Sequence, residues 1–204
     1  MSRYDEGVIA PKTLTDRETT LLLRATGERR GGFRDHLLFS LTLGTALREH
    51  EVVALDMRDV FDDAGTPRHR VALRVFKRSN PDRTMQQVVL NETIRAKLTK
   101  YRAWKARKGE SLAGDAPLFV SRHSKRLSKR QVRRLIHVWQ DRAGVEANLG
   151  FHALRHTAIT GLYRGKRCIK AAARFARHAS TRSTDRYTHI SDEELEQAVQ
   201  ALRC

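Results

Sequence analysis

The sequence predicts an α+β fold that is mainly α-helical, with a small three-stranded antiparallel β-sheet on one side. Amphipathic or nearly all-apolar segments fill most of the chain, several opened by capping-box pairs, and they indicate helices. Between residues 57 and 90 the pattern changes to short β-branched stretches separated by turn residues, which indicates strands. A length of 204 residues allows one full core, so we expect one domain.

The first part of this domain is expected to contain three helices after an irregular lead-in of residues 1–12. Thr15 and Glu18 have the capping-box spacing and open the first helix. The segment 33–43 is apolar nearly all round, which is typical of a helix buried on most of its faces. A shorter helical segment then places Arg48 at its opening turn, where an arginine either points into a cleft or is solvated.

Three short strands are expected next, at residues 57–61, 71–76 and 84–90. The stretches between them are rich in aspartate, asparagine, glycine and proline, the residues that form turns. Basic residues lie at the ends of the second hairpin and make it a basic finger: Lys77, Arg78 and Arg83.

The second half of the chain predicts four more helices. Asn91 can cap a long helix, and Ser128 opens another with a capping box. Further helices are expected from about residue 152 to 162 and from about 169 to 175. The helix after Ser128 begins with a basic cluster: Lys129, Arg130, Arg133 and Arg134. This cluster is interpreted either as a face that lies along a DNA groove or as a solvated face.

The charge balance is strongly basic, with 40 lysines and arginines against 23 aspartates and glutamates and a formal net charge of +17. Such an excess repels itself unless an anionic partner neutralises it. Nucleic acid is the first candidate for that partner, followed by ribosomal RNA-type or membrane-surface roles. A basic protein without such a partner is the remaining alternative.

The cysteine and hydropathy patterns indicate a protein that stays inside the cell. Cys168 and Cys204 form neither a disulfide framework nor the CxxC pair that is typical of zinc sites. The N-terminus lacks the apolar core of a signal peptide, and no run approaches the roughly 18 apolar residues of a membrane span. We therefore expect a cytoplasmic protein with no metal and no membrane contact.

Residues 151–190 concentrate side chains that suit chemistry on a phosphate group: His152, Arg155, His156, His178 and Tyr187. Guanidinium groups match phosphate oxygens, and a tyrosine hydroxyl becomes a nucleophile once it is deprotonated. Each histidine taken alone would be interpreted as a packed or surface residue. Their combination in one segment indicates an active site.

These residues also carry a resemblance to a known family. The motifs HALRH (152–156), RH (177–178) and DRYTH (185–189) look like the signature boxes of the tyrosine recombinases, the phage integrase family. Upstream, GTALREHEV resembles the first arginine box of that family, and FKRSNPDRTMQQVVL resembles its lysine hairpin. The five boxes occur in the order of the family, and the resemblance covers residues 13–190.

The resemblance implies the integrase catalytic-domain fold and a reaction that cleaves and rejoins DNA without metal or cofactor. A tyrosine becomes linked covalently to a DNA 3′ phosphate. Tyr187 would attack, Arg48 and Arg155 would hold the non-bridging oxygens, and Lys77 would protonate the departing 5′ oxygen. The implied catalytic residues are Arg48, Lys77, His152, Arg155, His178 and Tyr187.

The other implied roles are supporting ones. His152 and His178 would bind the phosphate and help to move the tyrosine proton. Glu51 is expected to hold Arg48 or its neighbours in place, and His156 to pack beneath the site. The residues expected to contact DNA are Arg78, Arg83, Lys129, Arg130, Arg133, Arg134 and Arg177.

Two departures from the family pattern qualify the resemblance. The family usually has a glycine before its second histidine, whereas this chain has Arg177, which either contacts phosphate or crowds the helix end. Most members carry an additional N-terminal DNA-binding domain, and only residues 1–12 precede the catalytic part here. The chain thus resembles short members such as the fimbrial invertases, or is a fragment, and an accessory DNA-binding protein is a candidate partner.

The implied function is site-specific DNA recombination, by integration, excision or inversion, in a prokaryotic cytoplasm and at the nucleoid. Two protomers would bind double-stranded DNA with inverted half-sites, and two such complexes would pair as a tetramer. The acidic, amphipathic and helical tail, residues 191–204, would dock on a neighbouring protomer. Two alternatives stay open: a type IB topoisomerase-like enzyme, and a catalytically weak DNA-binding regulator of the same fold.

Overall fold

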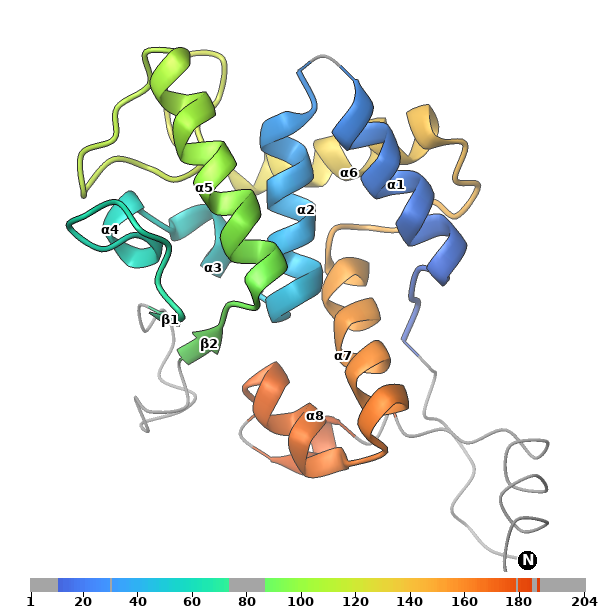
Figure 1. The fold of residues 1–204 in the computed structure, drawn as a ribbon. Coiled ribbons are helices and arrows are strands. Elements are labelled where there is room, and N and C mark those ends of the chain that lie inside the picture. Colours follow the sequence, from blue (N-terminus) through green and yellow to red (C-terminus); the bar gives the residue numbers. More distant parts are fainter. Residues whose placement is uncertain (1–10, 30, 74–86, 179, 185–186, 188–204) are drawn as a thin grey trace, which may run out of the picture.

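Helices form most of the structure (Figure 1), a computed structural model that describes residues 11–29, 31–73, 87–178, 180–184 and 187. None of the helices in these ranges is both long and apolar enough to cross a membrane. The helices are α1 (Asp16–Glu28), α2 (Phe33–Thr45), α3 (Glu49–Ala54), α4 (Met57–Val60), α5 (Glu92–Arg107), α6 (Lys129–Ala143), α7 (His152–Lys166), α8 (Ile169–Ala176) and the 3-10 helix η2 (Thr181–Ser183).

Side-chain caps fix the starts of three helices where the sequence predicts them. The Thr15 hydroxyl accepts the Glu18 N–H at 3.2 Å, and the Glu18 carboxylate accepts the Thr15 N–H at 2.7 Å. Ser128 and Gln131 form the same reciprocal pair at the start of α6. Asn91 accepts one N–H of α5 through its side chain. Each cap satisfies donors that the first turn of a helix leaves without an intrahelical partner.

Helix α2 is the centre of the larger core, because it packs against α1, α5 and α7 (Figure 1). Its residues from Leu37 to Leu41 are all buried, as its all-round apolar sequence predicts. Helix α6 packs on α1 through a buried stripe that includes Trp139. The indole N–H of Trp139 donates to the carboxylate of Asp35 at 2.8 Å, which satisfies both groups inside the core.

A smaller apolar cluster joins α7 and α8 to Ala46 and Tyr187. Its fully buried members are Ala46, Ile159, Tyr163, Ala172, Ala176 and Tyr187. In Figure 1, α8 lies below the end of α7, away from α5 and α6. Ala46 follows directly on the last residue of α2, so the larger core and the smaller cluster meet at the end of α2.

The expected first strand, residues 57–61, is wrong: the chain forms the short helix α4 there. Its apolar residues Met57, Val60 and Phe61 fit a helical spacing as well as a strand. The Asp59 carboxylate accepts the Asp56 N–H at 2.7 Å and closes a capping box, which decides for the helix. Phe61 makes only an isolated bridge, with Pro67.

The sheet therefore has two antiparallel strands in the part of the chain that the structure describes, β1 (Arg70–Ala72) and β2 (Gln87–Val89). Val71 pairs with Val88, and both side chains point into the core. The expected strands 71–76 and 84–90 are thus confirmed where they are described. Their continuation and the basic finger lie outside the described residues.

Candidate active site

The site begins at the C-terminal end of α2, where Ala46 adopts a left-handed conformation with φ of 51°. The Ala46 N–H still donates to Thr42 O, so the turn closes the helix. The carbonyl oxygens of Thr45 and Ala46 accept hydrogen bonds from arginines on later helices. This turn also leads into α3, whose N-cap is Arg48.

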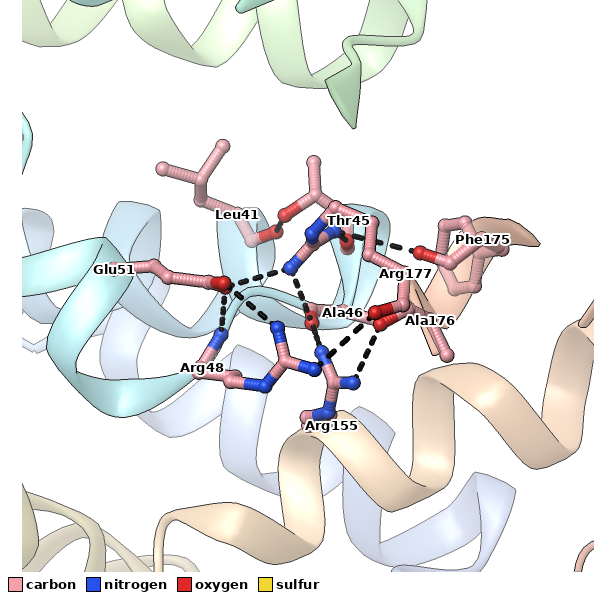
Figure 2. Close-up of polar contacts among 9 residues, drawn as sticks. All are labelled: Leu41, Thr45, Ala46, Arg48, Glu51, Arg155, Phe175, Ala176 and Arg177. Atoms are coloured by element: carbon pink, nitrogen blue, oxygen red, sulfur yellow. Dashed lines mark hydrogen bonds and ion pairs between the residues drawn. The ribbon is translucent and has the colours of Figure 1, made fainter. Parts of the chain in front are cut away.

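Glu51 holds Arg48 at two points. One Glu51 oxygen accepts the backbone N–H of Arg48 at 2.6 Å, and the other accepts its guanidinium Nη1 at 2.9 Å (Figure 2). The Glu51 side chain is 4% exposed, whereas the Arg48 side chain is 31% exposed. Arg48 is therefore anchored from inside the protein and accessible from outside.

Arg155 reaches the same place from α7. It is 2% exposed, and its guanidinium donates to the carbonyl oxygens of Ala46 and Ala176 (Figure 2). Burial lowers the pKa of Arg155 to about 9, and the positive charges of Arg48 and Arg177 act in the same direction. Arg155 stays protonated at neutral pH, and an anion bound beside it would stabilise its buried positive charge.

Arg177 is the C-cap of α8, and its side chain lies inside the protein. Its Nη2 forms an ion pair with Glu51 at 2.6 Å, and its Nη1 donates to Thr45 O at 3.1 Å (Figure 2). Burial of the Glu51 carboxyl group opposes its ionisation, but Arg177 and Arg48 outweigh that effect and lower the pKa of Glu51. The site thus contains an ionised glutamate between two arginines.

Tyr187 lies beside two histidines. Its hydroxyl is 2.6 Å from His156 Nδ1, and its ring centroid is 6.3 Å from that of His178. His178 is fixed in turn by Thr184, whose hydroxyl is 2.8 Å from His178 Nδ1. His152 packs edge-on against His156, with the ring centroids 4.6 Å apart. The tyrosine hydroxyl therefore lies in reach of an imidazole that can take its proton or orient it.

Comparison with protein families places residues 12–194 in one of them, described as the phage integrase family. The chain belongs to the phage integrase family. It is 31% identical over 168 residues to a tyrosine recombinase XerC of Caldanaerobacter subterraneus subsp. tengcongensis, covering 81% of this chain and 44% of that protein. It is 27% identical over 187 residues to the XerC of Vibrio cholerae, covering 92% of this chain and 57% of that protein. The chain thus spans about half the length of these curated relatives.

Solved structures show the same fold. The XerA recombinase superposes with a TM-score of 0.75 at 24% identity, over 96% of this chain and 67% of that one. The catalytic domain of bacteriophage HP1 integrase superposes with a TM-score of 0.60 at 18% identity, over 93% and 94% of the two chains. The expected integrase catalytic-domain fold is thereby confirmed.

Within this integrase fold, five of the six expected catalytic residues lie on the elements that surround Tyr187: Arg48, His152, Arg155, His178 and Tyr187 itself. Lys77, with Arg78 and Arg83 of the basic finger, lies outside the described residues. His156 was expected to pack beneath the site, and the structure places it in contact with the tyrosine hydroxyl. Among the described residues, no three histidine, cysteine, aspartate or glutamate side chains gather as a metal site.

The residues expected to contact DNA divide into two groups. Lys129, Arg130, Arg133 and Arg134 are exposed on α6, and Arg133 reaches Glu49 at 3.0 Å. Arg177, by contrast, has a side chain that is 1% exposed and turned toward Glu51. The buried side chain of Arg177 is therefore not available for the expected contact with DNA. Its only sequence signal is its position, where the integrase family usually has glycine.

Proposed function

We propose that this chain is a site-specific DNA recombinase that cleaves and rejoins DNA through a covalent 3′-phosphotyrosine. The observation that carries the proposal is the juxtaposition of a tyrosine hydroxyl with an imidazole, at 2.6 Å, in the segment that also supplies Arg155 and His178. Membership of the phage integrase family and the tyrosine recombinase relatives support the same chemistry.

The proposed step is an exchange of one phosphate ester for another. Tyr187 loses its proton to a neighbouring imidazole and attacks the phosphorus, while the bond to the 5′ oxygen breaks. Arg48 and Arg155 would hold the non-bridging oxygens, where negative charge grows in the transition state. Lys77 would give the proton to the departing 5′ oxygen. The ester energy is conserved, so rejoining needs no cofactor.

The basic start of α6 is the proposed backbone-binding surface. Its four cations are exposed and lie within two turns of the same helix: Lys129, Arg130, Arg133 and Arg134. Exposed lysines and arginines on one face can contact successive phosphates, which supplies affinity without sequence information. Among the structural neighbours, XerH site-specific recombinase is bound to a palindromic difH substrate, and the Tn1549 transposon integrase is in complex with transposon right end DNA. We propose the same kind of double-stranded partner, with inverted half-sites, for this chain.

Assembly on DNA would use the C-terminal segment, residues 191–204. The described residues line an open groove of about 1040 Å³ between β2, α7 and α8, with apolar walls that include Leu162 and Phe175. Four lysines and arginines border it: Arg70, Lys166, Lys170 and Arg174. The segment 191–204 is acidic and has an apolar stripe, so its charge and pattern complement this groove. We propose that it occupies the groove of a neighbouring protomer in a dimer on each site and a tetramer in synapsis.

Deleting residues 191–204 should then abolish tetramers on DNA while leaving monomer binding intact. Native gel shifts with increasing protein would reveal the assembly states, and unchanged tetramer formation would rule out this use of the tail.

Covalent capture on DNA tests the proposed function directly. The protein is incubated with a nicked DNA library made from the flanks of its own gene and denatured in SDS, and the attached DNA is sequenced. We expect an adduct from the wild type and none from Tyr187→Phe, which lacks only the attacking oxygen. Protein that binds the DNA but forms no adduct would contradict the proposal.

A further inference from the structure

Arg177 occupies a backbone position that an arginine seldom takes. It ends α8 in the left-handed conformation, with φ of 55°, and its N–H donates to carbonyl oxygens of the last turn. Glycine is the usual residue at such helix ends, because a Cβ atom is unfavourable there. Arg177 adopts this conformation with its side chain buried, whereas Arg167, the other left-handed arginine at a helix end, is exposed.

The Arg177 side chain makes tertiary contacts with residues distant in the sequence. Besides the Glu51 ion pair, its Nη2 donates to Ala46 O at 3.2 Å and its Nη1 to Phe175 O at 3.4 Å. Its Nε is buried without a hydrogen-bond partner among the described residues. A buried guanidinium with one unsatisfied N–H carries a desolvation cost, so the remaining contacts must offset it. These contacts connect the end of α8 to the end of α2.

The backbone of Arg177 contacts the site as well. Its carbonyl oxygen accepts a hydrogen bond from Arg48 Nη2 at 3.4 Å, and the next residue is His178. Arg177 thus touches Arg48 through its carbonyl, Glu51 through its guanidinium, and His178 through the peptide bond.

The charge balance of the cluster depends on Arg177. With it, Arg48 and Arg177 pair with the Glu51 carboxylate, and Arg155 adds a third guanidinium that shares Ala46 O with Arg177, so the cluster carries a net positive charge of two. A glycine at this position would leave a net charge of one. It would also leave Glu51 paired with Arg48 alone, and Arg48 would be held more tightly by the unshared carboxylate.

We infer that Arg177 is a positioning residue of this active site: it shares the Glu51 carboxylate with Arg48 and fixes the end of α8 to the end of α2. Arg48 is then held in place with its guanidinium available to a phosphate, and His178 is held at a fixed distance from Tyr187. The effect on cleavage rests on the proposed function, whereas the ion pair can be tested without DNA.

Arg167 provides a matched control for Arg177→Gly. It is also an arginine at a left-handed helix end, with φ of 47° at the end of α7, but it is exposed. Replacing it by glycine relieves the same backbone conformation and removes the same charge, without touching the Glu51 cluster. Arg167→Gly should therefore not reproduce the pH-dependent loss of melting temperature that the Glu51 ion pair predicts for Arg177→Gly.

The DNA-free measurement is thermal unfolding of both variants as a function of pH. Burial opposes ionisation of Glu51, but Arg177 and Arg48 outweigh it, so the folded pKa of Glu51 lies below 4.5. The stability that depends on ionised Glu51 is complete above that unfolded value and is lost as the pH falls through the folded pKa. Arg177→Gly should therefore melt well below the wild type at neutral pH, and the difference should shrink in acid. An effect of Arg177→Gly that matches Arg167→Gly at all pH values overturns the inference.

The second measurement is the single-turnover rate of covalent adduct formation at saturating DNA. Arg177→Gly should slow it by up to about 100-fold, the loss that a misplacement of about 1 Å in a catalytic group can cause. Arg167→Gly should react at the wild-type rate, and Arg177→Lys, which keeps the charge without the planar fork, should lie between. Wild-type rates for both Arg177 variants overturn the inference. If the wild type forms no adduct, the proposed function fails, and the unfolding comparison alone decides whether Arg177 organises Glu51.

Discussion

The arginines of this protein form two groups that use the same side chain in opposite ways. Arg155 and Arg177 are 2% and 3% exposed and donate to backbone carbonyls, and Arg177 also pairs with the Glu51 carboxylate. The cations at the start of α6 lie on the surface, and the Arg133 side chain is 64% exposed although it reaches Glu49. The first group therefore fixes the geometry of the site, and the second is available to an external anion.

The difference shows that net charge is a poor guide to what each cation does. Buried charges are screened little by salt, and removing one partner leaves the other unpaired at a large cost in stability. Exposed charges contribute little to stability, but each phosphate contact adds to the salt dependence of DNA binding. Substitutions in the two groups should thus affect different measurements.

The largest effect on stability is expected from Glu51→Gln. The substitution keeps the shape of the side chain but leaves Arg48, Arg155 and Arg177 without a neutralising charge. Breaking a buried pair in this way costs about 3 to 5 kcal/mol in the free energy of unfolding. Urea unfolding of the purified variant measures it.

Glu49→Gln is the matched control for Glu51→Gln, because Glu49 lies on the same helix and pairs with the mostly exposed Arg133. Its loss should stay within about 1 kcal/mol. Equal losses for the two glutamine variants would show that the buried cluster has no special role in stability.

A smaller loss of stability is expected from Arg155→Met. It removes the donors to Ala46 O and Ala176 O. Ala46 O keeps its hydrogen bond from Arg177, so the cost of about 1 to 3 kcal/mol comes from Ala176 O, which loses its Arg155 donor. Part of this cost is offset, because Arg48 and Arg177 repel the charge that is removed. Adduct formation should fall by about 100- to 1000-fold, as for loss of one oxyanion donor. If the variant is destabilised but cleaves at the wild-type rate, Arg155 does not contact the phosphate in the reaction.

Local signals in the sequence predict the helices better than the site. The capping pairs at Thr15 and Ser128 act over three residues, and the apolar run of α2 identifies a buried helix by itself. The burial of Arg177 depends on Glu51, which is 126 residues away in the sequence. It also depends on the left-handed turn at Ala46, which the local sequence does not predict. The expected strand at residues 57–61 failed because its apolar spacing fits a helix equally well.

The sequence predicts the candidate site residues as a set, but it does not predict their contacts. The histidines, Arg155 and Tyr187 lie close together in the sequence, so the resemblance identifies them jointly. The contact of His156 with the Tyr187 hydroxyl and the support of His178 by Thr184 depend on how α8 and η2 fold back onto α7. Such side-chain partners become visible only when the helices are placed in space.

The smallest effects on stability are expected on α6, where Arg134→Gln and Arg133→Gln separate two uses of an exposed cation. Arg133 holds Glu49 at 3.0 Å, so its loss should cost up to about 0.5 to 1 kcal/mol in the free energy of unfolding. Arg134→Gln should leave the free energy of unfolding unchanged, because Arg134 is exposed. If Arg134 contacts a phosphate, the substitution should reduce the slope of the log binding constant against log salt concentration by about 1. Fluorescence anisotropy with a duplex over a range of salt measures that slope. Unchanged slopes for both variants would show that DNA does not contact α6 and that its cations form a solvated face. A reduced slope for Arg134→Gln alone would show that this helix contacts the phosphates.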